Sequence, residues 1–220
     1  MKASQPKAVR VVIVEDHRMF REQLGHLINQ AEEMEVCGEA DNVKDGFAVI
    51  DKTRPNVAIV DISLKGASGL ELLKELRARQ IDVPVLVLSM HDEALYAERA
   101  LRAGASGYIT KHEASAEVMT ALRRVAAGEM YLNPQFMGRM MTKIMTGDGG
   151  AAEPVSRLAD RELEIFRLIG RGLTTREICE QLHLGMTTVD TYQARIKEKL
   201  NLPNAARLRL VASRWVQEHE

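Results

Sequence analysis

Cysteine is scarce in this sequence, with only Cys37 and Cys179 among 220 residues. The two lie far apart, and neither belongs to a CxxC pair or stands beside a histidine at ligand spacing, which argues against a thiolate metal centre. We therefore expect two buried free thiols. The six histidines show no metal spacing either, and we expect them to be structural or exposed.

Long hydrophobic runs are also absent. No apolar run approaches the ~18 residues needed to cross a bilayer, and the amino-terminal MKASQPKAVR lacks the apolar core of a signal peptide. The content of 45% hydrophobic and 28% charged residues is typical of a soluble globular chain of one or two domains. We expect a cytoplasmic protein with no membrane partner. The net charge of −1 divides only mildly along the chain.

Glycine-rich phosphate-binding loops are missing as well. No strand-like run is followed by GxGxxG or GxxxxGK[ST]. The pair Gly66 and Gly69 is too weak a signal for a nucleotide loop.

The first half of the sequence alternates regularly between strand-like and helix-like stretches. Each strand-like run is followed by an amphipathic helical stretch, which predicts a (βα)5 unit over residues 8–130. Three runs are continuously apolar, as expected for parallel strands covered by helices on both faces. We predict an α/β, flavodoxin-like fold with a parallel five-stranded sheet. The runs are 9–14, 34–40, 56–62, 83–90 and 107–111.

The second half has a different pattern. Periodicity is lost near Gly128, and TGDGGAAEP at 146–154 has the composition of a linker. We assign 131–155 to a linker region. Residues 156–220 show only helical periodicity, and four helical stretches in ~65 residues predict a small all-α domain.

Polar side chains stand where the predicted strands end. Glu15 and Asp16 follow the first strand, and Asp61 ends the third. The carboxyl ends of parallel strands meet at one edge of a sheet, so these carboxylates should converge, and unpaired they would repel one another. A hard divalent cation removes the conflict, and Mg²⁺ suits two or three carboxylates. Ser89 and Lys111 end the fourth and fifth strands, where a hydroxyl and an ammonium would bind a phosphoryl group.

Each of these residues also has a simpler interpretation. Glu15 and Asp16 could cap a helix that begins near Arg18. Lys111 alone is most often a solvated surface lysine, and Tyr108 by itself is more often a packing residue. The coincidence of five positions at strand ends favours a functional site.

Together these positions resemble the two-component response regulators, in particular the NarL/LuxR-type transcription factors, over nearly the whole chain. The resemblance implies that 8–130 is a phosphoacceptor receiver domain. Asp61 would accept a phosphoryl group from a sensor histidine kinase or a small acyl phosphate. The matching motifs are Glu15-Asp16, Asp61 in VDISLKGASGLELL, Ser89, and Tyr108 with Lys111 in GYITK.

The resemblance also implies the metal ligands. Mg²⁺ would be held by Asp16, Asp61 and the backbone carbonyl of Ser63, with Glu15 acting largely through water. Phosphoryl transfer asks a protein mainly for positioning and charge neutralisation, and the metal and Lys111 would supply both.

Two residues are implied as switch residues. Ser89, with Lys111, would bind phosphoryl oxygens, and Tyr108 would turn inward on phosphorylation. The surface of the fourth helix, fifth strand and fifth helix would then change, and dimerisation or release of the second domain would follow.

The second domain contains the local pattern of a helix-turn-helix. Thr174 to Glu177 forms a capping box that opens a helix through Leu182. A turn follows over 183–186, and a longer helix begins at Thr187. LADRELEIFRLIGRGLTTREICEQLHLG resembles the LuxR-type DNA-binding domain, which implies that this longer helix enters the major groove of double-stranded DNA. The alternative is a four-helix protein-interaction module.

The longer helix has an apolar and a polar side. Val189, Ile196 and Leu200 share one face, which leaves polar residues free to face a groove. The resemblance further implies that the last helix, Asn204 to Glu218, forms a dimer contact. The candidates for DNA contact are Thr187, Thr188, Asp190, Thr191, Arg195 and Lys199.

In the second domain the sequence departs from the family at three positions. Ala159 stands where members commonly have a threonine cap, which should cost ~1 kcal/mol unless Asp160 compensates. Asp190 and Ala194 stand where well-known members have basic residues. Asp190 could accept from cytosine N4, or could only complement the positive end of the helix dipole.

We therefore predict a phosphorylation-controlled, sequence-specific transcription regulator, dimeric on DNA, and not an enzyme beyond its own phosphoryl transfer. One alternative is a Mg²⁺-dependent phosphohydrolase of the haloacid dehalogenase type, but its second aspartate, two residues after Asp61, is Ser63 here. Another is a quorum-sensing regulator with an apolar ligand pocket, against which the acidic cluster and Lys111 argue.

Overall fold

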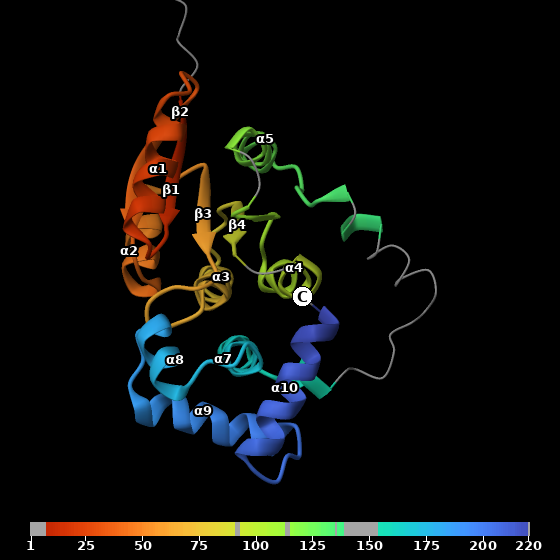
Figure 1. The fold of residues 1–220 in the computed structure, drawn as a ribbon. Helices are drawn as coiled ribbons and strands as arrows, with labels where there is room; N and C mark the ends of the chain where they lie inside the picture. The colour runs from red at the N-terminus through yellow and green to blue at the C-terminus, as the bar shows by residue number, and fades with distance from the viewer. Residues whose placement is uncertain (1–7, 91–92, 113–114, 135, 139–153, 220) are drawn as a thin grey trace, which may run out of the picture. The chain divides into compact units, whose positions relative to one another are not determined.

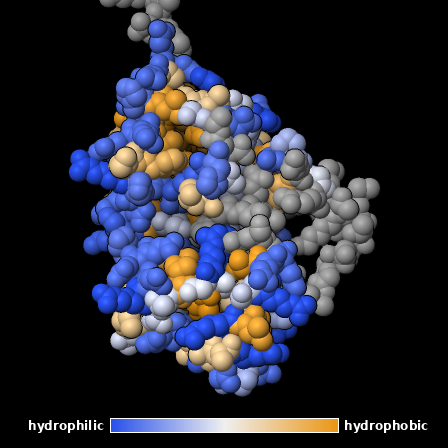
Figure 2. All heavy atoms as spheres, in the orientation of Figure 1, coloured by the Kyte–Doolittle hydropathy of each residue, from blue (hydrophilic) through white to orange (hydrophobic). Residues whose placement is uncertain are grey.

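The computed structural model describes residues 8–90, 93–112, 115–134, 136–138 and 154–219. The chain divides into two compact units, Met1–Gly138 and Arg139–Glu220. Hydrophilic side chains cover most of the surface visible in Figure 2, and hydrophobic ones form separate patches. Within the described ranges, none of the helices combines the length and the hydrophobicity that crossing a bilayer requires.

The first unit is built on a parallel sheet with the strand order β2-β1-β3-β4-β5. Figure 1 labels the first four of these strands. The predicted flavodoxin-like fold is therefore confirmed. Every residue of β3 and β4 is buried, because helices cover both faces of the sheet. The strands are β1 (Val9–Val14), β2 (Met34–Ala40), β3 (Val57–Asp61), β4 (Val85–Ser89) and β5 (Gly107–Thr110).

Amphipathic helices flank this sheet. Helices α1 and α5 share one hydrophobic core cluster with alternate residues of β1, β3 and β4. On the other face, Gly46 of α2 lies close to Val14 and to Leu72 of α3, and α4 packs beside α3. The helices are α1 (Arg18–Asn29), α2 (Val43–Thr53), α3 (Gly69–Ala78), α4 (Glu93–Ala103) and α5 (Ser115–Ala126).

The first unit extends further along the chain than the sequence indicates. Tyr131 is 8% exposed and belongs to the core cluster. The Tyr131 N–H donates a hydrogen bond to the Ser106 carbonyl, and the Tyr131 carbonyl accepts one from the Tyr108 N–H. Tyr131 also forms a parallel β-bridge with Gly107. These contacts hold residues after 130 on the edge of the sheet, so the predicted boundary at 130 is too early. Most of the predicted linker, including 146–153, lies outside the described residues.

The second unit is helical, as predicted. The capping box is present: the Thr174 hydroxyl accepts from the Glu177 N–H, and the Glu177 carboxylate accepts from the Thr174 N–H. The longer helix begins at Met186, one residue before the predicted start. The elements are the 3-10 helix η1 (Pro154–Arg157), α7 (Asp160–Gly170), α8 (Thr175–Leu182), α9 (Met186–Lys199) and α10 (Ala205–His219).

Helix α7 begins without a side-chain cap, because Ala159 at its N-cap position carries no acceptor. Glu162 accepts a hydrogen bond from the Ala159 N–H at 2.8 Å. This is half of a capping box. Glu162 thus compensates in part for the missing threonine.

Both cysteines are free, as predicted, but each is partly exposed rather than buried. Cys37 lies on β2, an edge strand of the sheet with a partly exposed pattern. Cys179 lies on the short amphipathic helix α8, whose buried residues are Ile178 and Leu182.

Candidate functional site

The carboxyl ends of the strands bring three acidic side chains together. Glu15 follows β1, Asp16 precedes α1, and Asp61 is the last residue of β3. One carboxylate oxygen from each lies within 4.8 Å of the others. Glu15 and Asp61 are 1% and 3% exposed, so two of these charges are removed from water. We call Glu15, Asp16 and Asp61 the acidic cluster.

The ammonium of Lys111 bridges the two buried carboxylates. Its Nζ lies 2.6 Å from Glu15 Oε2 and 2.8 Å from Asp61 Oδ2. The ring of Phe20, on α1, packs against it, with its centroid 4.8 Å from Nζ. The Lys111 side chain is only 7% exposed, so the interpretation as a solvated surface lysine is wrong.

Two neighbours of the site were not evident from the sequence. Phe20 contacts the Lys111 ammonium, and Arg21 donates from Nη1 to the Glu15 carbonyl and pairs with Glu39. Both lie in the first turn of α1. An aromatic or a basic residue in such a turn can as well serve core packing or face solvent, so the residue type alone does not indicate a role in the site. Their spacing after Asp16 is the only local signal that could have suggested them.

Burial dominates the ionisation of Asp61. Burial raises the pKa of Asp61 from 3.8 to about 7. The positive charge of Lys111 acts to lower this pKa, and the negative charge of Glu15 acts to raise it. Burial also acts to lower the pKa of Lys111, but the charges of Asp61 and Glu15 outweigh it and the pKa is raised. Lys111 is therefore positively charged at neutral pH, and it is the cation within hydrogen-bond distance of both buried carboxylates.

The acidic cluster fits a divalent metal. Among the described residues, Oδ1 of Asp61 is a buried oxygen without a hydrogen-bond partner. A buried acceptor left unsatisfied costs ~1–3 kcal/mol, so this oxygen is suited to a ligand rather than to packing. Carboxylate oxygens are the ligands that hard cations prefer. The acidic cluster can therefore hold a metal ion.

We predict that the metal-free protein loses stability as the pH rises. The folded chain holds the Asp61 proton to a higher pH than the unfolded chain. The stability from Asp61 is therefore fully present below its ordinary pKa of 3.8 and is lost as the pH rises through about 7. Asp61→Asn should remove this dependence. Hydrogen exchange of peptides from β1 and β3, measured across that range without metal, checks it.

Adding Mg²⁺ at about pH 8 should stabilise the wild type more than Asp61→Asn, because binding to the folded state adds stability and the variant has lost one ligand charge. Identical pH profiles for the two proteins would contradict the assignment to Asp61.

Ser89 and Tyr108 are both fully buried. Ser89 ends β4, and its carbonyl accepts from the Lys111 N–H at 2.7 Å. Tyr108 lies on the neighbouring strand β5, with its ring already inward in this structure. An inward turn of Tyr108 on phosphorylation therefore requires a second conformation in which the ring is outside.

The glycines after Asp61 have a structural explanation. A Cβ at Gly69 would lie 1.9 Å from the Asp61 carbonyl oxygen, so the close approach of α3 to the end of β3 requires glycine. Gly66 has a φ of 77°, a conformation that glycine adopts readily. Neither position indicates a nucleotide loop.

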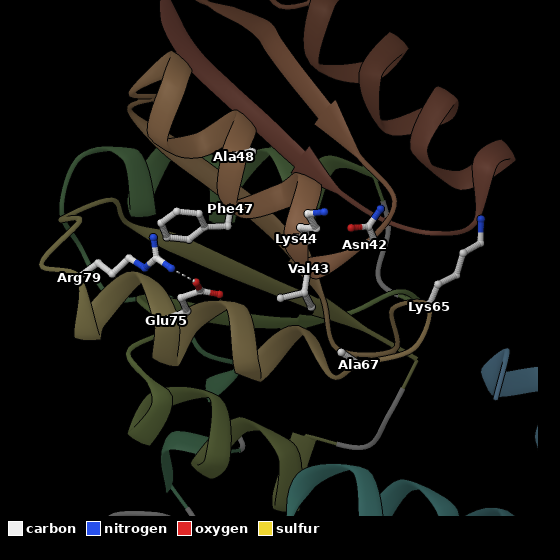
Figure 3. A pocket seen from close by; sticks show the side chains of 9 residues that line it. All are labelled: Asn42, Val43, Lys44, Phe47, Ala48, Lys65, Ala67, Glu75 and Arg79. Atoms are coloured by element: carbon white, nitrogen blue, oxygen red, sulfur yellow. Dashed lines mark ion pairs between the residues drawn. The ribbon is translucent and has the colours of Figure 1, made fainter. Parts of the chain in front are cut away.

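A pocket of about 480 Å³ lies between α2 and α3, apart from the acidic cluster (Figure 3). At one end the Arg79 guanidinium lies 4.3 Å from the Phe47 ring centroid and pairs with Glu75 at 2.7 Å. At the other end Lys65 pairs with Asp41 at 3.0 Å. Four of its nine lining residues are charged: Lys44, Lys65, Glu75 and Arg79. This pocket does not resemble the enclosed apolar cavity that a lactone-binding regulator needs.

Helix α9 has the two sides that the sequence predicts. Val189 and Ile196 are buried in the second unit. The Thr191 hydroxyl donates to the Thr187 carbonyl at 2.7 Å, which leaves its methyl group and oxygen lone pair for an outside partner. All six candidates for DNA contact are exposed: Thr187, Thr188, Asp190, Thr191, Arg195 and Lys199.

Lys199 differs from the other candidates. Its Nζ lies 2.6 Å from Oε2 of Glu162 on α7, so its charge is engaged within the unit. Helical periodicity places Lys199 on the polar side of α9. It cannot show that another helix presents a carboxylate there.

Comparisons with known proteins match both units. Residues 11–123 match the response regulator receiver domain, and residues 156–212 match the bacterial regulatory proteins of the luxR family. The virulence regulator BvgA of Bordetella pertussis is 32% identical over 207 residues, covering 93% of this chain and 97% of BvgA. The DNA-binding transcriptional activator DevR/DosR of Mycobacterium tuberculosis is 35% identical over 199 residues, covering 88% and 89%.

A solved structure agrees with these matches. The LuxR-family two-component response regulator from Aurantimonas sp. SI85-9A1 is 27% identical, with a TM-score of 0.59, and the match covers 63% of this chain and 99% of that chain. The matched families are those of transcription regulators rather than enzymes, which decides against the phosphohydrolase alternative. With a receiver domain followed by a helix-turn-helix domain, the chain belongs to the LuxR-type two-component response regulators.

Proposed function

We propose that Asp61 is the phosphoacceptor of this response regulator. A carboxylate oxygen of Asp61 attacks the phosphorus of a phosphohistidine on a sensor kinase, or of a small acyl phosphate. The new P–O bond makes an aspartyl phosphate, and the imidazole or carboxylate of the donor leaves. The observation that carries this proposal is the buried Asp61 Oδ1, which has no hydrogen-bond partner, beside the Lys111 ammonium.

The surrounding residues have distinct roles in the transfer. Lys111 holds one oxygen of Asp61 in place and neutralises charge on the incoming phosphoryl oxygens, with the Ser89 hydroxyl as a second donor. When bound, Mg²⁺ supplies further charge neutralisation. Its proposed ligands are Asp16, Asp61 and the backbone carbonyl of Ser63, with Glu15 acting through water.

Phosphorylation would then control the DNA-binding unit. Phosphoryl-Asp61 draws in Ser89 and favours the inward conformation of Tyr108, and the two states differ in the surface formed by α4, β5 and α5. The site shifts this equilibrium only by stabilising one state more than the other. We infer that the active form is a homodimer on paired half-sites of double-stranded DNA, with α9 in the major groove. DNA as the partner implies a cytoplasmic protein.

One experiment tests this function. The full chain is incubated with acetyl phosphate and Mg²⁺, and its mass, oligomeric state and bound genomic fragments are compared with those of untreated protein. We expect one added phosphoryl group, a shift towards dimer and tighter binding to a defined set of fragments. Labelling that survives chelation of the metal would contradict the metal proposal. Equal DNA affinity before and after full labelling would contradict the control proposal.

Asp190 is proposed to read a base directly. Helix α9 begins at Met186, so Asp190 is its fifth residue, and the first turn contains no acidic residue. The effect of the helix dipole falls off within the first turn, which weakens the dipole interpretation. An exposed carboxylate here can accept from cytosine N4, worth ~1–3 kcal/mol of discrimination.

We predict that Asp190→Asn binds non-specific DNA more tightly and loses preference at one base pair, because the variant removes a repulsive charge and changes the acceptor. Selection from a randomised DNA pool, with wild type and variant side by side, measures both. Glu198→Gln is the matched control, an exposed carboxylate near the other end of α9. If wild type and Asp190→Asn select the same motif, Asp190 does not read a base.

A further inference from the structure

The first turn of α7 holds both helices of the helix-turn-helix through two adjacent side chains. Nη2 of Arg161 donates to the carbonyl of Leu182, the last residue of α8, at 3.0 Å. The next residue, Glu162, accepts from Nζ of Lys199, the last residue of α9, at 2.6 Å. The carboxyl ends of α8 and α9 are therefore both attached to one turn of a third helix.

This attachment is itself held in place. Oε2 of Glu162 accepts from the Ala159 N–H at 2.8 Å as well as from Lys199. Because Ala159 offers no side-chain cap, the same carboxylate caps α7 and holds α9. Nη1 of Arg161 is fixed by Glu164 at 2.6 Å.

Lys199 is poorly arranged to bind a DNA phosphate. Its side chain is 39% exposed, but its ammonium is paired with Glu162, and this carboxylate would repel a DNA phosphate brought close to Lys199. Arg195, also on α9, presents a contrast in its partner: its guanidinium lies over the ring of Tyr192 with a centroid distance of 6.0 Å, whereas the ammonium of Lys199 is paired with a carboxylate.

We propose that Lys199 is a positioning residue for DNA recognition and not a phosphate contact. Through Glu162 it fixes the orientation of α9 on α7, while Arg161 fixes the end of α8, so that the exposed side of α9 meets the groove as a rigid surface. This inference rests on the proposed role of α9 as the helix that enters the groove.

Glu162→Gln separates the two roles by the sign of its effect. Glutamine keeps an acceptor for the Ala159 N–H but removes the charge that holds Lys199. If Lys199 positions α9, specific affinity should fall by about three- to tenfold. If Lys199 binds phosphate, releasing it and deleting a negative charge should tighten binding. The measurement is the dissociation constant of the full chain for its selected DNA site, at a temperature where circular dichroism shows all variants folded.

A double-mutant cycle and the salt dependence complete the test. Lys199→Gln should weaken specific binding as Glu162→Gln does, and the double variant should be no weaker than the weaker single one, because both remove one interaction. The slope of log affinity against log salt should stay that of wild type. Arg195→Ala, the reference for a phosphate contact, should flatten the slope by about one unit.

Other outcomes would overturn the inference. Additive losses with a flatter slope for Lys199→Gln would make it a phosphate contact. A lower unfolding midpoint with unchanged DNA affinity would make the pair a purely structural one. A wild-type chain that selects no DNA motif would overturn the proposed function, and this inference with it.

Discussion

Asp61→Asn is expected to abolish phosphorylation while the fold stays intact. The amide has nearly the shape of the carboxylate but is far less nucleophilic, and it replaces the ion pair between Asp61 Oδ2 and Lys111, 2.8 Å long, by a hydrogen bond to a neutral acceptor. Intact-mass spectrometry after incubation with acetyl phosphate and Mg²⁺ should show a stoichiometric phosphoryl group on wild type and none on the variant.

The matched control for this substitution is Asp51→Asn. Asp51 is an exposed aspartate on α2 that pairs with Arg54 at 2.7 Å, and its variant should be labelled as fully as wild type. Circular dichroism should be the same for all three proteins. Stoichiometric labelling of Asp61→Asn would place the acceptor at another residue.

Lys111→Met should destabilise the metal-free first unit by ~3 kcal/mol at about pH 8, because it leaves the carboxylates of Glu15 and Asp61 buried without their cation. The loss should be smaller at lower pH. Without Lys111 the pKa of Asp61, already about 7, rises further, so protonation relieves the repulsion. Mg²⁺ should recover part of the stability by replacing the lost charge. Urea unfolding followed by hydrogen exchange in β1 and β3 measures these differences.

Lys65→Met is the control for the lysine, since Lys65 also pairs with a carboxylate, Asp41 at 3.0 Å, but both side chains are about 40% exposed. Exposed pairs contribute ~0–1 kcal/mol, so this variant should hardly change stability. Trp215, the single tryptophan, lies in the second unit. Its fluorescence therefore reports unfolding of that unit, and its unfolding midpoint should not shift in either variant. A loss from Lys65→Met as large as that from Lys111→Met would show that burial of the acidic cluster is not the cause.

The location of the receiver site follows from local patterns joined by one rule of topology. Continuous apolar runs identify parallel strands, and parallel strands end at the same edge, so Asp61 and Lys111 can be placed together although 50 residues separate them. The helix-turn-helix can also be predicted from the sequence, because the capping box at Thr174 and the spacing of Val189 and Ile196 are local signals. Both inferences depend on side chains whose position follows from the backbone period.

Contacts between side chains that no backbone period relates were decided by the tertiary structure. The packing of Tyr131 on the edge of the sheet moves the end of the first unit past 130, because burial of its ring depends on which strand lies beside it. Periodicity places Lys199 on a polar face, and only the packing of α9 on α7 brings it to Glu162, 37 residues away in sequence. A helical pattern specifies which face of a helix is polar, but the charge that meets that face comes from another helix, and its position is set when the core packs.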